Sequence, residues 1–488
     1  MTQGPSLFNI RAHHRGQRRR ARDTMWLWAS ITAGGQPPAG VLRSPAATLR
    51  LSELVRGSAL GGRLEALRGR SVLVTTGTQL ASALALIELD GVARRLVLCT
   101  PDLAAEHLPT VARNAEADAW VHDALPHSHP PAGLDVRVSV EDVRVARGLT
   151  RRHSHDTEWI LLTSGTTGVP KLVAHSLASL TSALGRRPAQ AEDIVWSTFY
   201  DIRRYGGLQI FLRALYSGSL VLSSPGEPVA AFFARAAAAS VTHISGTPSH
   251  WRRALMSGVA ASIAPRYVRL SGEIADQAIL DGLRAAYPAA QIAHAFASTE
   301  AGVAFEVGDG RAGFPASLVA DASEKAELKI HGGTLHVRSP GNAARYLGDH
   351  APRLKADDGF VDTGDRVELT EGRYYFVGRN GGVINVGGLK VHPEEVEAVI
   401  NSHPWVRMSL VKARRSPITG AVVTADIVLA DNARGHGVPL SPPTIEVLTR
   451  EIIDTCRRSL APFKVPAVVR IVPALELSAS GKLVRPSA

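Results

Sequence analysis

The stretch LLTSGTTGVPK, from Leu161 to Lys171, combines two Gly, four Ser/Thr and one Lys directly after an apolar segment. Glycine allows a backbone to approach an anion closely, hydroxyl groups donate hydrogen bonds, and lysine adds positive charge. The stretch is not a GxxxxGK[ST] P-loop, because Gly165 and Gly168 are three positions apart and Lys171 follows a proline. Two interpretations stay open, a phosphate-binding loop of another kind and an ordinary Ser/Thr-rich turn between strands.

Apolar runs alternate with helical segments before and after this loop, which is typical of an α/β domain. Runs 71–76 and 95–100 predict buried strands on either side of a helix over 78–92. Residues 159–165 predict a further strand and loop, followed by a helix over 176–185. Ligands of such parallel sheets bind at the carboxyl ends of the strands. We therefore expect one crevice to collect the loops after residues 162, 199, 246, 271 and 296.

The pattern changes after residue 310. Segments 326–339 and 366–379 alternate polar and apolar residues around Gly turns, which predicts antiparallel hairpins. Further on, a Gly-rich stretch, short strands and a helix over 442–459 predict a small α+β domain. The predicted fold class is α/β: a large N-terminal domain with parallel sheets, helices and a β-hairpin subdomain, followed by a small mobile α+β C-terminal domain.

Composition excludes several classes of protein. Cys99 and Cys456 are the two cysteines in 488 residues, which argues against a disulfide framework and a Cys-built zinc site. No apolar run reaches the ~18 residues of a membrane span, so we expect a cytoplasmic protein. Residues 1–24 hold six Arg and one Asp and so carry 5 of the net charge of +11. We interpret 1–24 as a basic disordered extension rather than a nucleic-acid-binding arm, with Met25 as an alternative start.

Five motifs follow one another along the chain: LLTSGTTGVPK, FASTEAG, DGFVDTGD, GRNGGVINVGGLK and SASGKLVR. In this order they resemble the adenylate-forming superfamily of AMP-dependent synthetases and ligases, most of all a stand-alone acyl-CoA synthetase. The resemblance covers about residues 45–488. It implies an N-terminal adenylate-forming domain over 25–378 and a C-terminal lid domain over 379–488, after the 1–24 extension.

The resemblance implies ATP-dependent activation of a small carboxylic acid. The carboxylate attacks the α-phosphorus of ATP, pyrophosphate leaves, and an acyl-adenylate forms. A thiol, expected to be that of CoA, then displaces AMP and gives a thioester. ATP, Mg²⁺ and CoA are thus the implied cofactors. The alternatives are an amino- or aryl-acid adenylation that feeds a separate carrier protein, a luciferase-like oxygenase, and a non-catalytic nucleotide-binding homologue.

The motifs imply roles in binding ATP. In the family the glycine-rich loop holds the β- and γ-phosphates. Here that loop comprises Thr163, Ser164, Gly165, Thr166, Thr167 and Gly168, with Lys171 as added charge. Thr299 matches the α-phosphate contact, and Glu300 matches the Mg²⁺ ligand, for which a carboxylate is the suitable donor. Asp365 and Arg379 match family residues that contact the ribose. Gly272 and Glu273 fall where the family has its adenine pocket.

Lys482, in the last motif, matches the catalytic lysine that bridges the substrate carboxylate and the phosphate. We expect its replacement by alanine to slow adenylation at least about a hundredfold. Gly381 stands where the family usually has Asp or Lys as the pivot of a domain rotation, and glycine can absorb such a backbone change. Gly387, Gly388 and Lys390 match the loop that faces the active site in the thioester-forming state, so they are candidates for a thiol channel.

Residues 197–207 fall where family members bind the acid, and the candidates for this acyl pocket are Tyr200, Asp201, Tyr205 and Gly206. Two roles are open for Asp201, pairing with a substrate amine or pairing internally with Arg203 or Arg204. An arginine pointing inward from position 203 or 204 would instead favour a dicarboxylic or hydroxylated acid. Small residues within 245–248 and 294–297 leave room for a ring or a medium chain.

Overall fold

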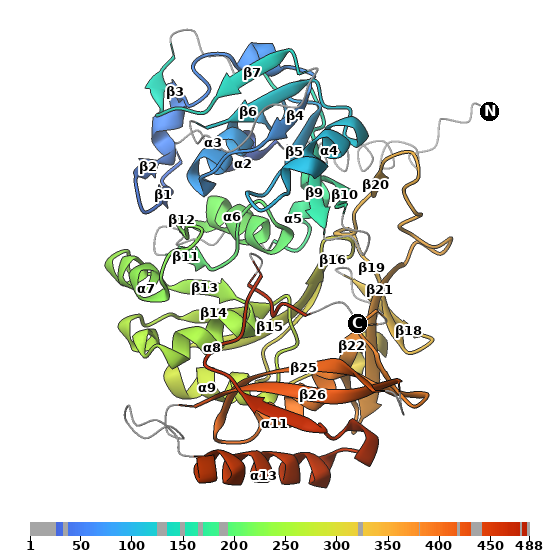
Figure 1. The fold of residues 1–488 in the computed structure, drawn as a ribbon. Coiled ribbons are helices and arrows are strands. Elements are labelled where there is room, and N and C mark those ends of the chain that lie inside the picture. The colour runs from blue at the N-terminus through green and yellow to red at the C-terminus, as the bar shows by residue number, and fades with distance from the viewer. Residues whose placement is uncertain are drawn as a thin grey trace, which may run out of the picture.

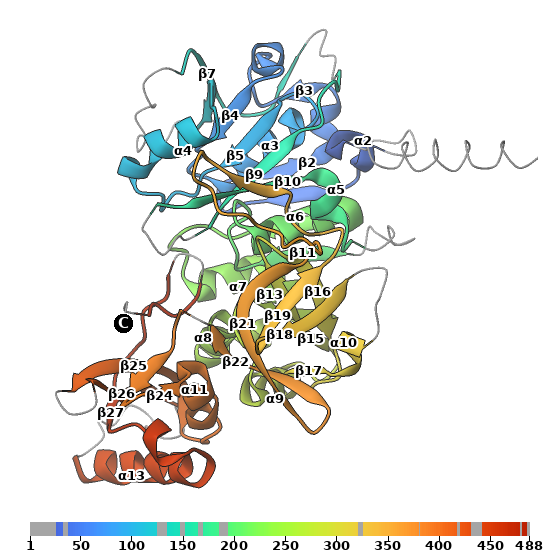
Figure 2. The ribbon, with the colours of Figure 1, turned by 90° about the vertical axis from the view of Figure 1, so that its right-hand side faces the viewer.

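The computed structural model describes residues 26–32, 38–123, 134–146, 152–163, 169–184, 194–320, 326–379, 381–416, 420–430, 442–478 and 481–485. Two large sheets lie one above the other, with a five-stranded sheet beside them and a small domain at one end (Figures 1 and 2). This mixed α/β architecture agrees with the predicted fold class.

The first large sheet has the strand order β20-β10-β9-β5-β4-β6-β7. Its strands are β4 (Ser71–Val74), β5 (Arg95–Leu98), β6 (Ala119–His122), β7 (Val136–Ser139), β9 (Glu158–Thr163), β10 (Lys171–Ser176) and β20 (Arg345–Leu347). The five strands from β7 to β9 are parallel, and β4 and β5 are buried along their whole length, as expected for a doubly covered parallel sheet.

The sequence prediction missed β10. The chain turns back after β9 and pairs antiparallel with it, so that Lys171 lies opposite Thr163. A short helix, α5 (Leu177–Thr181), follows, capped by the Ser176 side chain. The Ser/Thr-rich stretch therefore connects two paired strands, and its central residues 164–168 lie outside the described part of the chain.

The second large sheet has the order β16-β15-β14-β13-β11-β12-β1-β2. Its strands are β1 (Val41–Arg43), β2 (Thr48–Arg50), β11 (Val195–Thr198), β12 (Ser219–Leu222), β13 (His243–Gly246), β14 (Tyr267–Ser271), β15 (Gln291–Ser298) and β16 (Gly302–Val307). The edge strands β2 and β16 are antiparallel, and the six strands between them are parallel.

Helices α3 (Gln79–Leu89) and α6 (Tyr205–Ser217) lie between the two sheets (Figure 1). One apolar core joins these helices to both sheets, which explains why α3 is buried on almost every side. Other helices cover the outer faces: α4 (Leu108–Asn114) on the first sheet, and α7 (Val229–Ala238), α8 (Pro248–Met256) and α9 (Gln277–Ala286) on the second. The short elements are α2 (Leu27–Ile31), α10 (Ser317–Ala320), η1 (Leu51–Val55), η2 (Leu64–Leu67), η3 (Ala105–His107), η5 (Val259–Ser262), β3 (Gly57–Ser58) and β8 (Arg144–Val145).

The two predicted hairpins are confirmed in the antiparallel five-stranded sheet. Its strands are β17 (Phe314–Pro315), β18 (Glu327–His331), β19 (Thr334–Arg338), β21 (Val361–Thr370) and β22 (Arg373–Arg379). The small domain contains β23 (Ile384–Val386), β24 (Leu389–Val391), α11 (Pro393–Asn401), β25 (Val406–Ser416), β26 (Gly420–Leu429), α13 (Pro442–Ser459), η6 (Pro462–Lys464) and β27 (Val468–Ile471).

After β27 the chain leaves the small domain and runs back toward β13 and β15 of the large one (dark red in Figure 1). This return carries the last motif, 478–485, to the carboxyl ends of the strands, where the predicted crevice lies. Within the described residues, no helix combines the length and the apolar character needed to cross a bilayer.

Candidate active site

Lys482 is held against two loops of the large domain. The Thr247 hydroxyl, after β13, donates a hydrogen bond to the Gly481 carbonyl oxygen at 2.7 Å. The Leu483 amide donates to a carboxylate oxygen of Glu273, after β14, at 3.1 Å. Gly481 has a φ of +72°, and a Cβ there would meet the His250 ring at 1.7 Å. Only glycine therefore lets this segment lie so close to α8.

The Lys482 side chain extends over Gly272, where a Cβ would lie 3.5 Å from its Cε atom. The residue keeps accessible surface, but the protein around it lowers its pKa by desolvation. The Glu273 and Asp365 carboxylates oppose this effect, whereas Arg379 adds to it. The ammonium group therefore lies among the charged residues that the motifs singled out.

Glu273 has a second role that its sequence position did not indicate. Its carboxylate accepts hydrogen bonds from the Ser249 amide, at 2.9 Å, and from the Ser249 hydroxyl, at 3.0 Å. These donors lie in the first turn of α8, so the carboxylate caps this helix. Glu273 thus connects α8 to the segment that carries Lys482.

Asp365 and Arg379 lie opposite each other on β21 and β22. The Arg379 Nε atom is 3.1 Å from the Asp365 Oδ1 atom, and its Nη2 atom donates to the Thr363 carbonyl oxygen at 3.0 Å. Desolvation raises the pKa of Asp365, while Arg379 and Lys482 lower it. Strand pairing thus places an acceptor and a donor side by side, close to Lys482.

Glu300 lies in the turn between β15 and β16. The Tyr346 hydroxyl, from β20, donates to the Glu300 Oε1 atom at 3.1 Å, and the Lys171 Nζ atom lies 5.4 Å from the centre of the Tyr346 ring. Tyr346 therefore links Glu300 to β10 and to the strand ends beside the Ser/Thr-rich stretch. Among the described residues, no three His, Cys, Asp or Glu side chains are grouped to hold a metal ion. Mg²⁺ commonly binds one or two carboxylates together with phosphate oxygens, and Glu300 fits that donor set.

The backbone of Thr299 is fixed by a buried histidine. The His175 Nε2 atom lies 2.7 Å from the Thr299 carbonyl oxygen, and its Nδ1 atom lies 2.9 Å from the Ser179 hydroxyl. Because the acceptor is a carbonyl, Nε2 carries the proton. Burial lowers the pKa of His175 to about 4, so the ring is neutral at neutral pH.

The predicted acyl residues Tyr200, Tyr205 and Gly206 lie at the start of α6 and in the loop before it. The Tyr200 hydroxyl donates to the Ser271 carbonyl oxygen at 2.6 Å, and burial strongly raises its pKa. The Tyr205 ring is buried, with its centre 5.6 Å from that of His175. A Cβ on Gly206 would lie 3.6 Å from the Tyr200 ring. The three residues therefore lie close to Ser271 and to the His175 that supports Thr299.

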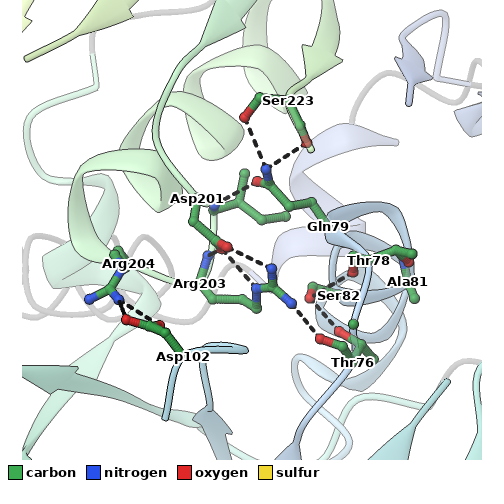
Figure 3. A network of polar contacts seen from close by, with 12 residues as sticks. Thr76, Thr78, Gln79, Ala81, Ser82, Asp102, Asp201, Arg203, Arg204 and Ser223 are labelled. Carbon is green, nitrogen blue, oxygen red and sulfur yellow. Dashed lines mark hydrogen bonds and ion pairs between the residues drawn. The ribbon is translucent and has the colours of Figure 1, made fainter. Parts of the chain in front are cut away.

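Asp201 forms the internal ion pair, the second of its two possible roles (Figure 3). Its carboxylate accepts from the Arg203 Nε atom at 2.8 Å and from Nη2 at 2.6 Å. The third guanidinium nitrogen donates to the Thr76 carbonyl oxygen, and the Arg203 side chain is 0% exposed. Arg204 pairs with Asp102 at 2.6 Å. Both arginines next to Asp201 are thus already paired with carboxylates.

The thiol-channel candidates form the tip of the β23–β24 hairpin. Gly387 and Gly388 both have positive φ, +59° and +89°, as a two-residue hairpin turn with two left-handed residues requires. The Gly388 amide donates to the Asn385 side chain at 2.8 Å. Lys390 and both glycines are exposed.

Sequence reasoning missed Thr247, His175 and Tyr346. Each forms a hydrogen bond with a residue more than forty positions away in the sequence. Thr247 bonds to Gly481, His175 to Thr299, and Tyr346 to Glu300. Thr247 had a local signal, because Thr-Pro before a helix predicts an N-cap. Its contact with Gly481 had no signal in the sequence. His175 and Tyr346 had no distinguishing signal in the sequence.

The geometry agrees with comparisons to known families. Residues 40–347 match the family described as AMP-binding enzyme, and residues 395–482 match the AMP-binding enzyme C-terminal domain. The chain belongs to the AMP-binding enzyme family. In this AMP-binding enzyme the first match includes Glu273 and Glu300 and the second ends at Lys482, whereas Asp365 and Arg379 lie between the two matched ranges.

This AMP-binding enzyme is 26% identical over 385 residues to the human mitochondrial acyl-coenzyme A synthetase ACSM5, covering 73% of this chain and 65% of that protein. The chain thus spans about two-thirds of that relative's length. This chain is also 27% identical over 406 residues to the 2-succinylbenzoate–CoA ligase of Salmonella typhimurium. That match covers 76% of this chain and 81% of the ligase. ATP-bound MatB from Rhodopseudomonas palustris has the same fold, with a TM-score of 0.73 at 19% identity, over 94% of this chain and 96% of that one.

Proposed function

We propose that the protein activates a carboxylic acid with ATP, releases pyrophosphate, and transfers the acyl group from the acyl-adenylate to the thiol of CoA. The observation that carries this proposal is the position of Lys482, which lies over Gly272 and within electrostatic reach of Asp365 and Arg379. A lysine at this point can neutralise negative charge that develops on a reacting carboxylate and phosphate. The names of the two relatives, an acyl-coenzyme A synthetase and a CoA ligase, support the same reaction.

In the first step the reacting carboxylate and the α-phosphate are both negative, so catalysis requires neutralisation and alignment. Lys482 supplies the positive charge between them. Asp365 accepts hydrogen bonds from the ribose hydroxyls, and Arg379 keeps its carboxylate in place. The Ser/Thr-rich stretch from Thr163 to Gly168, with Lys171, holds the departing pyrophosphate.

Glu300 would hold Mg²⁺ together with phosphate oxygens, and the ion would neutralise charge that develops on the phosphates. Tyr346 orients this carboxylate through its hydroxyl. His175 holds the Thr299 backbone in place, and the Thr299 side chain would contact the α-phosphate.

For the second step we propose that the small domain turns about Gly381 and brings the Gly387–Lys390 hairpin to the site as the thiol channel. Glycine at 381 tolerates the backbone change that such a rotation needs. Free CoA is the acceptor that the relatives favour, and a separate carrier protein is the alternative acceptor.

The test is ATP–pyrophosphate exchange against a panel of carboxylic acids, followed by product analysis with and without CoA. We expect exchange with at least one acid and CoA-dependent release of AMP and thioester. Lys482→Ala should lower the exchange rate at least about a hundredfold, because the positive charge is lost in the transition state. Lys329→Ala, which changes an exposed lysine paired with Asp358 in the five-stranded sheet, is the matched control.

Each other outcome has a definite meaning. No exchange with any acid would favour a nucleotide-binding protein without activity. Exchange without a CoA product would favour a carrier protein or an oxygenase-like second step. A Lys482→Ala variant with a normal exchange rate would remove the assignment of that lysine.

A further inference from the structure

A partly buried cluster of charged and phenolic side chains lies between α6 and the eight-stranded sheet. Arg269 on β14 pairs with Glu306 on β16, with 3.0 Å between its Nε atom and a carboxylate oxygen. Arg213 on α6 lies within electrostatic reach of both residues. Against the opposing effect of burial, Arg269 and Tyr267, which lie close to the Glu306 carboxylate, lower its pKa. The Arg269 side chain is 3% exposed and that of Glu306 is 36% exposed, so the cluster runs from the buried guanidinium of Arg269 to the surface at β16.

The charges of this cluster do not balance. Two guanidinium groups face one carboxylate, and burial followed by repulsion from Arg269 lowers the pKa of Arg213. In the described part of the chain, the buried Nη2 atom of Arg269 and the buried Nε atom of Arg213 have no hydrogen-bond partner. A charged donor that is buried without an acceptor is costly, so these two atoms point to an anionic ligand.

The cluster lies on the same strand as the site described above. Side chains two apart on a strand face the same side, so Arg269 faces the side of β14 that Ser271 faces. Gly272, which contacts Lys482, follows three residues after Arg269, about 10 Å along a strand. Across the sheet, Ala293 and Ala295 are the partners of Arg269 and Ser271, and both are small. On this strand pair the positions between Gly272 and Arg269 that face this side are therefore small, and the Tyr200 side chain, bonded to the Ser271 carbonyl oxygen, lies beside them.

We propose that the activated acid is a dicarboxylic acid, with its reacting carboxylate at Lys482 and its second carboxylate bound by Arg269 and Arg213. This assignment rests on the proposed function. A second carboxylate brings the cluster to two positive and two negative charges and accepts from the two donors that lack partners. Arg203 and Arg204 cannot serve instead, because Asp201 and Asp102 already occupy them.

The experiment compares dicarboxylic acids of increasing length, and an aromatic dicarboxylic acid, with their monomethyl esters and with monocarboxylic acids of the same length. The readout is kcat/KM for ATP–pyrophosphate exchange. We expect the best diacid to exceed its half-ester at least about tenfold, because a charge-assisted hydrogen bond contributes that much. A half-ester or monocarboxylic acid that is activated as well as the diacid would overturn the proposal.

Two variants locate the second carboxylate. Arg213→Gln keeps the Arg269–Glu306 pair and should lower the ratio of diacid to half-ester at least about fivefold. The double variant Arg269→Gln/Glu306→Gln removes both charges of the pair together, so it buries no unpaired carboxylate, and should abolish the preference. Activity with the half-ester should fall less than activity with the diacid in both variants, and KM for ATP, measured in the same assays, reports whether the nucleotide site is intact. Arg457→Gln, at an exposed arginine on α13, is the control.

The two levels of proposal fail in different ways. Exchange with no acid at all would overturn the adenylation reaction and this inference with it. Exchange that shows no preference for diacids, or a preference that survives both variants, would overturn this inference alone.

Discussion

The Thr247 hydroxyl and the Gly481 carbonyl oxygen lie 2.7 Å apart, although 234 positions separate these residues in the sequence. Thr247 also begins α8, because its side chain accepts a hydrogen bond from the His250 amide at 3.0 Å. One hydroxyl thus serves both as a helix cap and as the contact that sets the residue before Lys482. The position of the lysine depends on the loop after β13.

Replacing Thr247 by valine should slow adenylation about three- to tenfold, because a net hydrogen bond contributes about 0.5–1.5 kcal/mol. The lost cap should also lower the free energy of unfolding by about 1 kcal/mol. Transfer to the thiol from a preformed acyl-adenylate should not change. Thr247→Ser, which keeps the hydroxyl, is the control. A valine variant that loses stability but keeps its exchange rate would show that the hydroxyl acts only as a cap.

His175 should make stability depend on pH. Its pKa of about 4 in the folded protein lies below the ordinary value near 6.5, so the folded state favours the neutral ring. The corresponding stabilisation is complete above about pH 6.5 and is lost as the pH falls toward 4, by about 3 kcal/mol. His175→Gln should remove this contribution, so the difference in unfolding free energy between wild type and variant should shrink by that amount from pH 7 to pH 4.

Urea denaturation across this pH range measures the effect, with His350→Gln, at an exposed histidine, as the control. Other buried histidines titrate in both proteins and cancel in the difference. Parallel pH profiles for wild type and the His175 variant would contradict the prediction.

Asp365→Asn should raise KM for ATP at least about tenfold, because an amide replaces a charged acceptor of hydrogen bonds. It should also free Arg379 from its carboxylate partner at 3.1 Å. Initial rates of pyrophosphate exchange at varied ATP give this constant. Asp362→Asn, three residues earlier on β21 and more exposed, should leave it unchanged. Equal effects of the two variants would mean that Asp365 does not contact the nucleotide.

Lys390→Ala should separate the two steps of the reaction. Pyrophosphate exchange should not change, because Lys390 lies on an exposed hairpin, whereas KM for CoA in thioester formation should rise about tenfold. The two assays on one enzyme preparation make the comparison. A fall in exchange, or a normal CoA-dependent rate, would exclude the hairpin as the thiol channel.

The parts of the fold that sequence predicted best are those with local signals. The runs at 71–76 and 95–100 are strands because both faces of the sheet are covered, and such strands read as continuous apolar segments. The hairpins at 326–339 and 366–379 alternate around glycines and fold as expected. Strand β10 was missed, because Lys171–Ser176 is mixed in character and is a strand through its pairing with both β9 and β20.

The candidate site shows the same contrast between residues with a local signal and residues that depend on tertiary contacts. Motif order predicts Glu300, Asp365, Arg379 and Lys482 as site residues, and the structure places Lys482 within electrostatic reach of Asp365 and Arg379. Tyr346 and Thr247 reach Glu300 and Gly481 through tertiary contacts, and the sequence around these residues does not indicate such contacts. Arg269 did carry a signal, an arginine within the otherwise apolar strand YVRLS, but its importance depends on Arg213, more than fifty residues earlier.

Residues 483–485 form a tether between the two domains. Leu483 is bonded to Glu273 of the large domain, while Arg485 forms a two-pronged ion pair with Glu397 of α11, both bonds at 2.8 Å. Two residues span at most about 7 Å when fully extended. If both contacts hold, a turn of the small domain that carries Glu397 beyond the reach of this short segment and the Arg485 side chain pulls Lys482 away from Gly272. While both contacts hold, withdrawal of Lys482 and rotation of the small domain would therefore be coupled.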